Sequence, residues 1–461
     1  MSVIAAFMVP HPPMIVPEIG KGSEEQIRET TLSYERIADE VAALQPDTLI
    51  ITSPHAVMYS DYFHISPGSA ASGSFRKFGA PGVRFSEKYD TQLVQRLCEL
   101  ADAEDFPAGT LGEREPTLDH AVMVPLWFIR RKYAGGKLVR IGLSGLPLTE
   151  HYRLGQLIAR AAEDTGRRAV LIASGDLSHK VQTYGPYGFA EEGPAYDRRI
   201  MDVCGRAAFG ELFDFDESFC EKAAECGHRS FVIMAGVFDG LRVKASVLSH
   251  QDVTGVGYGI CTFYPDGEDA GRHFLAAYTE KLRQACLETA EKSDAYAKLA
   301  RTAVEAWVLR RERLPVPDGL PEEMLTRSAG TFVSLHRHGQ LRGCIGTIAA
   351  TQPSIAEEIV QNAVSACSRD PRFPAVTAAE LGDLEISVDV LGELEPIDSP
   401  DALDVKRYGV VVSRGAKRGL LLPNLDGVDT VEDQIRIARQ KGGIREGEPY
   451  RLERFEVVRH Y

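Results

Sequence analysis

The sequence lacks any uninterrupted run of the roughly 18 apolar residues that a membrane-spanning helix needs, so we expect no membrane partner. It also lacks a basic excess: 52 Lys and Arg stand against 66 Asp and Glu, and the net charge is −14. That balance argues against a nucleic-acid partner, which usually meets a basic face. None of the eight cysteines forms a C-x-x-C pair, and scattered cysteines in a chain of this length are typical of reduced thiols. Because the N-terminus also carries no positively charged leader, we expect a cytoplasmic protein.

No low-complexity tract or internal repeat interrupts the chain, and 44% of its residues are hydrophobic, as is typical of globular proteins. At 461 residues it exceeds what one ordinary hydrophobic core holds. The patterning predicts a first domain over residues 1–265, a charged helical connector over 266–292 and a second domain over 293–461.

The first domain alternates apolar runs with helical patterns. Nearly continuous apolar runs of this kind are typical of buried strands in a parallel sheet, and they occupy residues 3–9, 47–52, 138–145 and 168–175. Residues 23–44 repeat apolar positions at helical spacing, and 255–265 resembles a closing strand. The alternation predicts an α/β domain whose mostly parallel sheet has helices on both faces.

The second domain mixes a helix with hairpins. Ser293 or Asp294 can cap a helix that begins there. Strand patterns follow over 330–348, 384–391 and 409–423. These features predict a smaller α+β domain.

Histidines follow the predicted strands of the first domain at several points. His11 and His55 lie just past two of the strands, and His179 closes the stretch "SGDLSH" after a third. His120 stands at the start of an apolar helix. Since ligands of open α/β sheets bind beyond the carboxyl ends of the strands, we expect at least three of these four histidines to lie at one edge of the domain.

Neutral imidazoles suit Fe, Zn, Cu or Ni, and two histidines with one carboxylate form the ligand set of non-haem Fe(II) oxygenases. The segment at 221–240 supplies the best carboxylate, Glu225, which precedes a Cys-Gly break and an apolar helix. Cys226 and His228 are close enough in sequence to compete for the ligand role.

The first domain resembles the class III extradiol ring-cleavage dioxygenases. The motifs that carry the resemblance occur in the family's order: "HPP" at 11–13, "SPH" at 53–55, "LDHAVMVPL" at 118–126, "SGDLSH" at 174–179 and "ECG" at 225–227. The resemblance implies that His11, His55 and Glu225 bind Fe(II). It also implies that His179 is the acid/base and that His120 contacts substrate or oxygen.

Ring opening needs a metal that holds a catechol and dioxygen side by side, and a base that takes a hydroxyl proton and later returns one. An uncoordinated histidine suits the second task. The expected function is therefore ring cleavage of a catecholic or related aromatic substrate by O2, in a protein that resembles a family whose members often form homo-oligomers.

The same motifs resemble the MEMO family, in which a cysteine of a Cys-Gly segment lies beside two histidines. "ECG" satisfies both patterns, and Glu225 is preferred because a hard carboxylate suits an iron that cycles with oxygen. With Cys226 as the ligand, the alternative is a metal-binding module without oxygenase turnover that works with a radical SAM partner. A hydrolase that uses Zn is a third possibility, and Cu is a further alternative metal.

The second domain resembles the AMMECR-type family, on "LRGCIG" at 341–346, "SRDPRFPAV" at 368–376 and "RGLLLPNL" at 418–425. Arg342, Cys344 and the two glycines of this motif define a candidate second site, while a buried structural role for Cys344 is the competing interpretation. The fusion resembles proteins of the AmmeMemoRadiSam set, which is why a radical SAM protein is an expected partner.

Overall fold

The computed structural model describes residues 2–115, 117–337, 339–425 and 427–461. The chain forms two compact units, Met1–Tyr278 and Thr279–Tyr461, with the division inside helix α9 (Phe274–Lys292). Within the described residues, no helix has the length and apolar character to cross a lipid bilayer. Each unit has its own hydrophobic core and is described by itself.

The first unit is built on a six-stranded sheet in the order β7-β2-β8-β1-β10-β9. The pairs β7–β2, β2–β8 and β8–β1 are parallel, and β10 and β9 add to the edge as antiparallel strands. The strands are β1 (Val3–Val9), β2 (Thr48–Ser53), β7 (Lys137–Gly142), β8 (Ala169–Ser174), β9 (Leu241–Gln251) and β10 (Tyr258–Glu268).

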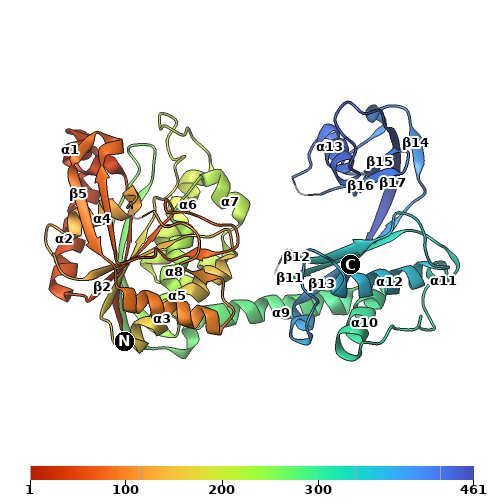
Figure 1. Cartoon of the computed structure of the whole chain (residues 1–461), viewed down its shortest axis with the longest axis horizontal. Coiled ribbons are helices and arrows are strands. Elements are labelled where there is room, and N and C mark those ends of the chain that lie inside the picture. The colour runs from red at the N-terminus through yellow and green to blue at the C-terminus, as the bar shows by residue number, and fades with distance from the viewer. Residues whose placement is uncertain (1, 116, 338, 426) are drawn as a thin grey trace. The chain divides into compact units, whose positions relative to one another are not determined.

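Both faces of this sheet are covered, because alternate residues of each strand enter different cores (Figure 1). In β1, Phe7 and Val9 pack with helices α2 (Arg28–Leu44) and α4 (His120–Ile129). Ala6 and Met8 of the same strand face the other core. That core contains α3 (Thr91–Ala103), α5 (Leu148–Asp164), α6 (Glu192–Gly205) and α8 (His228–Val237).

A separate antiparallel hairpin lies before α3. Its strands β4 (Ala70–Phe75) and β5 (Ala80–Lys88) are joined by a short 3₁₀ turn, Arg76–Phe78. The shorter elements of the unit are α1 (Pro17–Gly20), β3 (Phe63–His64), β6 (Ala108–Gly109) and α7 (Glu217–Ala223). The hairpin and the segment before α8 both contribute to the site described below.

The second unit is built on a seven-stranded antiparallel sheet in the order β12-β11-β13-β17-β15-β16, with β14 paired to β17. Helices α10 and α12 share a core with β11 and β13, while α13 packs on β15 and β16. The strands are β11 (Thr331–Arg337), β12 (Gln340–Gly346), β13 (Leu384–Leu391), β14 (Glu395–Ile397), β15 (Tyr408–Arg414), β16 (Lys417–Leu421) and β17 (Arg451–His460). The helices are α10 (Ala295–Arg310), α11 (Glu322–Thr326), α12 (Ile355–Ser368) and α13 (Val431–Lys441).

The predicted fold classes are confirmed: a mostly parallel α/β unit is followed by a smaller α+β unit. Asp294 caps α10 by accepting hydrogen bonds from the backbone N–H groups of Tyr296 and Ala297. The sequence analysis did not predict strand β9, whose residues are mostly exposed or half-buried at the sheet edge, nor the hairpin β4–β5.

Candidate metal centre

Three neighbouring parallel strands end beside one another and deliver the polar residues of the site. His11 follows the end of β1 by two residues, and His55 follows the end of β2 by two. Ser174 ends β8, which lies between these strands, and Asp176 and His179 come directly after it. Parallel order therefore brings the three segments to one edge of the sheet, as expected for ligand sites of this fold class.

Ser174 fixes the orientation of the His11 ring. Its hydroxyl donates to the carbonyl oxygen of Ala121 at 2.7 Å, so its oxygen accepts from Nδ1–H of His11 at 3.0 Å. The proton on Nδ1 leaves Nε2 of His11 with a free lone pair. Burial, and after it the neighbouring histidines, hold the pKa of His11 well below its usual value, so the ring is neutral.

His55 reaches the same point from the end of β2. Its backbone N–H donates to the Ser53 hydroxyl at 3.2 Å, and Ser53 donates to Asp119, the N-cap of α4, at 2.7 Å. Nε2 of His55 lies 3.1 Å from Nε2 of His11. Burial lowers the pKa of His55 as well, which favours the neutral, metal-binding form of the ring.

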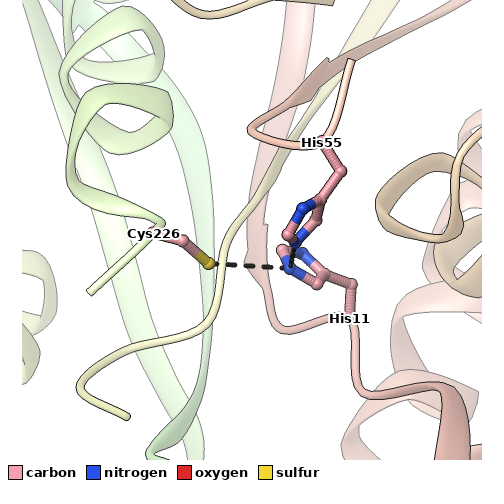
Figure 2. A group of neighbouring side chains, drawn as sticks. All are labelled: His11, His55 and Cys226. Atoms are coloured by element: carbon pink, nitrogen blue, oxygen red, sulfur yellow. Dashed lines mark hydrogen bonds between the residues drawn. The ribbon is translucent and has the colours of Figure 1, made fainter. Parts of the chain in front are cut away.

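Cys226 completes this group from the segment before α8. Its Sγ lies 3.6 Å from Nε2 of His11 and accepts a hydrogen bond from the backbone N–H of Asp176 at 3.3 Å. The ligand atoms of His11, His55 and Cys226 all lie within 4.8 Å of one another. Figure 2 shows the sulfur and the two rings turned toward the same point.

Glu225 is not among the ligand atoms that the described residues bring together. Its carboxylate turns the other way and accepts a hydrogen bond from the backbone N–H of His228, at the start of α8, at 2.6 Å. Burial raises the pKa of Glu225 to about 7. His228 is engaged too, with Nδ1 3.3 Å from the Tyr196 hydroxyl and Nε2 3.0 Å from the carbonyl oxygen of Leu212. In this turn it is therefore Cys226, and not the expected Glu225, whose ligand atom lies with those of His11 and His55.

His179 and His120 surround the group without joining it. Nε2 of His179 lies 4.0 Å from Oδ2 of Asp176, and its ring stacks on Tyr187 with the ring centroids 5.1 Å apart. The ring centroids of His120 and His55 are 4.2 Å apart. Burial lowers the pKa of each of these two histidines to about 4, so both rings are neutral near pH 7.

Asp176 links the parts of the centre. One of its carboxylate oxygens accepts from the backbone N–H of His11 at 2.7 Å, and the other lies 3.9 Å from Nε2 of that residue. Asp176, His179 and Cys226 form a second group of possible ligands. Burial raises the pKa of Asp176 to about 7.

The sequence interpretation assigned no role to Ser53, Ser174 or Asp119. The two serines are the last residues of β2 and β8, in the segments "TSPH" and "ASGD".

A cavity of about 730 Å³ opens onto His55 and His120. Its apolar lining includes Phe78 and Phe85 of hairpin β4–β5, Leu118, and Met123 of helix α4. Its charged lining is basic except for Asp119 and comprises Arg76, Lys77 and Arg84. Its volume is that of a site for a small organic molecule.

In the second unit, Arg342 is held by an ion pair. Its guanidinium binds both carboxylate oxygens of Glu380, at 2.7 and 3.2 Å, and donates to the carbonyl oxygen of Pro374 at 2.9 Å. A Cβ atom on Gly343 would lie 2.4 Å from the carbonyl oxygen of Ala366 in α12. This glycine of "LRGCIG" therefore allows the close approach of strand and helix.

Cys344 lies next to these groups on β12. Its sulfur accepts a hydrogen bond from the Ser334 hydroxyl at 3.3 Å, and its backbone N–H donates to Asp370 at 2.8 Å. Arg372 donates to the Cys344 carbonyl oxygen at 3.1 Å and pairs with Asp370 at 2.7 Å. Burial raises the pKa of the Cys344 thiol, which disfavours the nucleophilic thiolate.

Comparison with known families assigns both units. Residues 5–261 match the family described as the catalytic LigB subunit of aromatic ring-opening dioxygenase. The chain belongs to the LigB family. Residues 297–460 of this LigB-family chain match the AMMECR1 family, which confirms the fusion that the motifs indicated.

Relatives of this LigB-family protein include fused and shorter chains. A protein of Clostridium acetobutylicum is 39% identical over 469 aligned positions, covering 100% of this chain and 99% of its own. A Thermotoga maritima protein is 46% identical over 167 positions, covering 36% of this chain and 96% of its own. Two crystal structures of uncharacterized proteins also align. One from Pyrococcus horikoshii has 28% identity and a TM-score of 0.34, covering 37% of this chain and 90% of its own. One from Escherichia coli K12 has 15% identity and a TM-score of 0.37, covering 56% of this chain and 99% of its own.

Proposed function

We propose that the LigB unit is an Fe(II)-dependent enzyme that opens the ring of a catechol or related aromatic substrate with O2. In this proposal His11 and His55 hold the metal, and the Cys226 thiolate replaces the Glu225 carboxylate that the resemblance implied. The observation that carries the proposal is the convergence of these three ligand atoms beside a cavity for a small organic molecule, in a LigB-family unit. Three protein ligands leave positions open for substrate and oxygen.

The donor set fits a transition metal. Nε2 of His11 presents a lone pair because Nδ1 donates to Ser174, and both imidazoles are neutral. The Cys226 thiol has a pKa held high by burial, and it would lose its proton when a cation binds. A bound Fe(II) would supply the point at which a catechol and O2 are held side by side.

His179 is the proposed acid/base. Its ring is neutral near pH 7, stacks on Tyr187, and lies near Asp176. A neutral ring nitrogen can take the hydroxyl proton of a catechol and return it to the opened product. His120 is a proposed polar contact to substrate, since its ring lines the cavity between His55 and Phe78.

A second candidate follows from the identity of the third ligand. A thiolate is softer than a carboxylate, so the group with Cys226 also suits Zn or Cu. The alternative proposal is therefore a metal-binding module without oxygenase turnover, and the resemblance of the fusion implies that it works with a radical SAM partner. The fused AMMECR1 domain is consistent with this alternative.

The two candidates differ in oxygen consumption. The purified chain is analysed for metal, loaded with Fe(II) without air, and then supplied with O2 and a panel of catechols. The dioxygenase proposal predicts substrate-dependent oxygen uptake and ring-fission products. Stoichiometric iron binding without either product or uptake across the panel rejects the dioxygenase and leaves the binding module. Tight native Zn without iron activity rejects the assignment of iron.

A further inference from the structure

We propose that the LigB unit contains a second small-molecule site, separate from the metal centre, that binds a nucleotide-sized polyanion carrying two or more phosphate groups. The site is a cavity of about 640 Å³ between strand β5, the C-terminal end of α4 and the turn that leads into β7. It shares only Arg84 and Phe85 of hairpin β4–β5 with the cavity at the metal centre.

The lining of the cavity carries an excess of positive charge. Five cationic residues line it, and its one acid, Glu87, is already neutralised by Arg130, with Nη2 2.6 Å from Oε2. The other four cations make no ion pair with any described residue and are exposed: Arg84, Lys88, Arg131 and Lys137. Four uncompensated positive charges around one cavity are unexpected in a chain whose net charge is −14.

Contacts of Arg130 and Tyr133 hold the backbone around the cavity in place. Arg130 is mostly buried and joins β5 to the turn before β7, because it also donates to the carbonyl oxygens of Tyr133 and Gly136, at 3.3 and 3.1 Å. The turn is fixed further by the Tyr133 hydroxyl, which donates to the carbonyl oxygen of Pro46 at 2.7 Å. The four cations without an ion pair therefore extend from a backbone that is already held in place. The entropy lost on binding then comes mainly from ordering their side chains.

The chemistry of the lining defines the ligand class. Arg and Lys together bind phosphate oxygens, Arg through its fork and Lys as a point charge. Trp127 adds an aromatic surface, and the guanidinium of Arg131 lies 4.3 Å from its ring centroid. A volume of this size accommodates a nucleotide, and a ligand with at least two phosphates matches the number of free cations.

Binding at this cavity can be followed by the fluorescence of Trp127. The chain contains two tryptophans, so the substitution Trp307→Phe leaves Trp127 as its single tryptophan. The full-length Trp307→Phe chain is titrated with ATP and with inorganic tripolyphosphate, without added metal, at about 0.1 M salt. Calorimetry on the unsubstituted chain checks each titration. We expect a saturable change in Trp127 emission. Tighter binding of ATP than of tripolyphosphate identifies a nucleotide, and equal binding identifies an inorganic polyphosphate.

Matched variants locate the site. Lys88→Ala with Lys137→Ala should weaken binding by about tenfold or more, since each lost contact to a phosphate removes a charge-assisted bond. Lys132→Ala is the control, because Lys132 neighbours the cavity but pairs with Asp39 and does not line it. The proposal fails if neither polyanion binds saturably by calorimetry, or if the control weakens binding as much as the double variant.

Discussion

The chemistry of the centre depends on whether Glu225 or its neighbour Cys226 joins His11 and His55 as a metal ligand. In the structure the Cys226 thiol lies beside His11, and the Glu225 carboxylate accepts a hydrogen bond from the backbone N–H at the start of α8. We therefore expect Cys226→Ala to lower the affinity for iron by more than about tenfold, because a ligand is lost. Glu225→Gln keeps an oxygen acceptor for α8 and should bind iron within about twofold of the unsubstituted chain. Metal content after anaerobic loading and dialysis measures both, and the reverse order would restore Glu225 as the ligand.

His179 differs from His11 and His55 in standing outside the group that includes both of them. His179→Ala should retain iron and lose catalytic rate by about 10²- to 10⁴-fold, the range that general acid–base groups contribute. Oxygen uptake and metal content are measured on the same preparation. His273→Ala is the matched control, because His273 is exposed and pairs with Asp239. Loss of iron from His179→Ala would show that this residue is a ligand and not the base.

Among the elements, the end of β8 and the start of α8 approach so closely that only glycine fits. A Cβ atom on Gly175 would lie 2.1 Å from Cα of Gly227, and this contact places the Cys226 segment beside His11. Gly175→Ala should destabilise the LigB unit by about 1–3 kcal/mol, as overpacking does, and should weaken iron binding. Gly82→Ala is the control, since its Cβ would meet no atom within 4 Å and no positive φ constrains it. Thermal unfolding and iron titration test the pair, and an unchanged affinity in Gly175→Ala would separate this contact from the site.

The sequence predicts those parts of the structure that leave a long, regular pattern of apolar residues. The strands before His11 and His55 are long apolar runs, and their ends fall within a residue or two of the predicted positions. Strand β9 is an edge strand with little burial, so no apolar run marks it. The choice between Glu225 and Cys226 depends on the backbone of a turn, where Ala224 has a φ of 54°, and single-residue turn geometry leaves no periodic signal.

In the second unit, Asp370 ties the loop after α12 to strand β12. Its hydrogen bonds with Arg372 lower the pKa of the carboxyl to about 2, and it also accepts from the Cys344 backbone. A pKa lower in the folded than in the unfolded chain stabilises the fold above pH 4, and that contribution is lost as the pH falls through about 2. Asp370→Asn should therefore destabilise the unit by about 1–2 kcal/mol at pH 7 and by roughly half as much near pH 3. Urea unfolding at both pH values tests this, and a difference independent of pH would contradict it.

At the scale of the whole molecule, the two units keep separate cores. The clusters around the six-stranded sheet belong to the first unit, and the clusters around α10, α12 and α13 belong to the second. The proposed metal and polyanion sites both lie in the first unit, and the group around Cys344 lies in the second. Ligands of the first unit should therefore act on its stability alone.

Calorimetric unfolding of the full chain should then show two transitions, since multidomain chains depart from two-state behaviour. Iron at about 100 times its dissociation constant stabilises the state that binds it by about 2.7 kcal/mol, so one transition should move to higher temperature. Asp370→Asn identifies the transition of the second unit by lowering its temperature. At the same iron concentration Cys226→Ala should lose at least about half of the iron-induced stabilisation of the first unit, and it should leave the second transition where it is. A single transition that iron raises as a whole would mean that the two units unfold as one cooperative body.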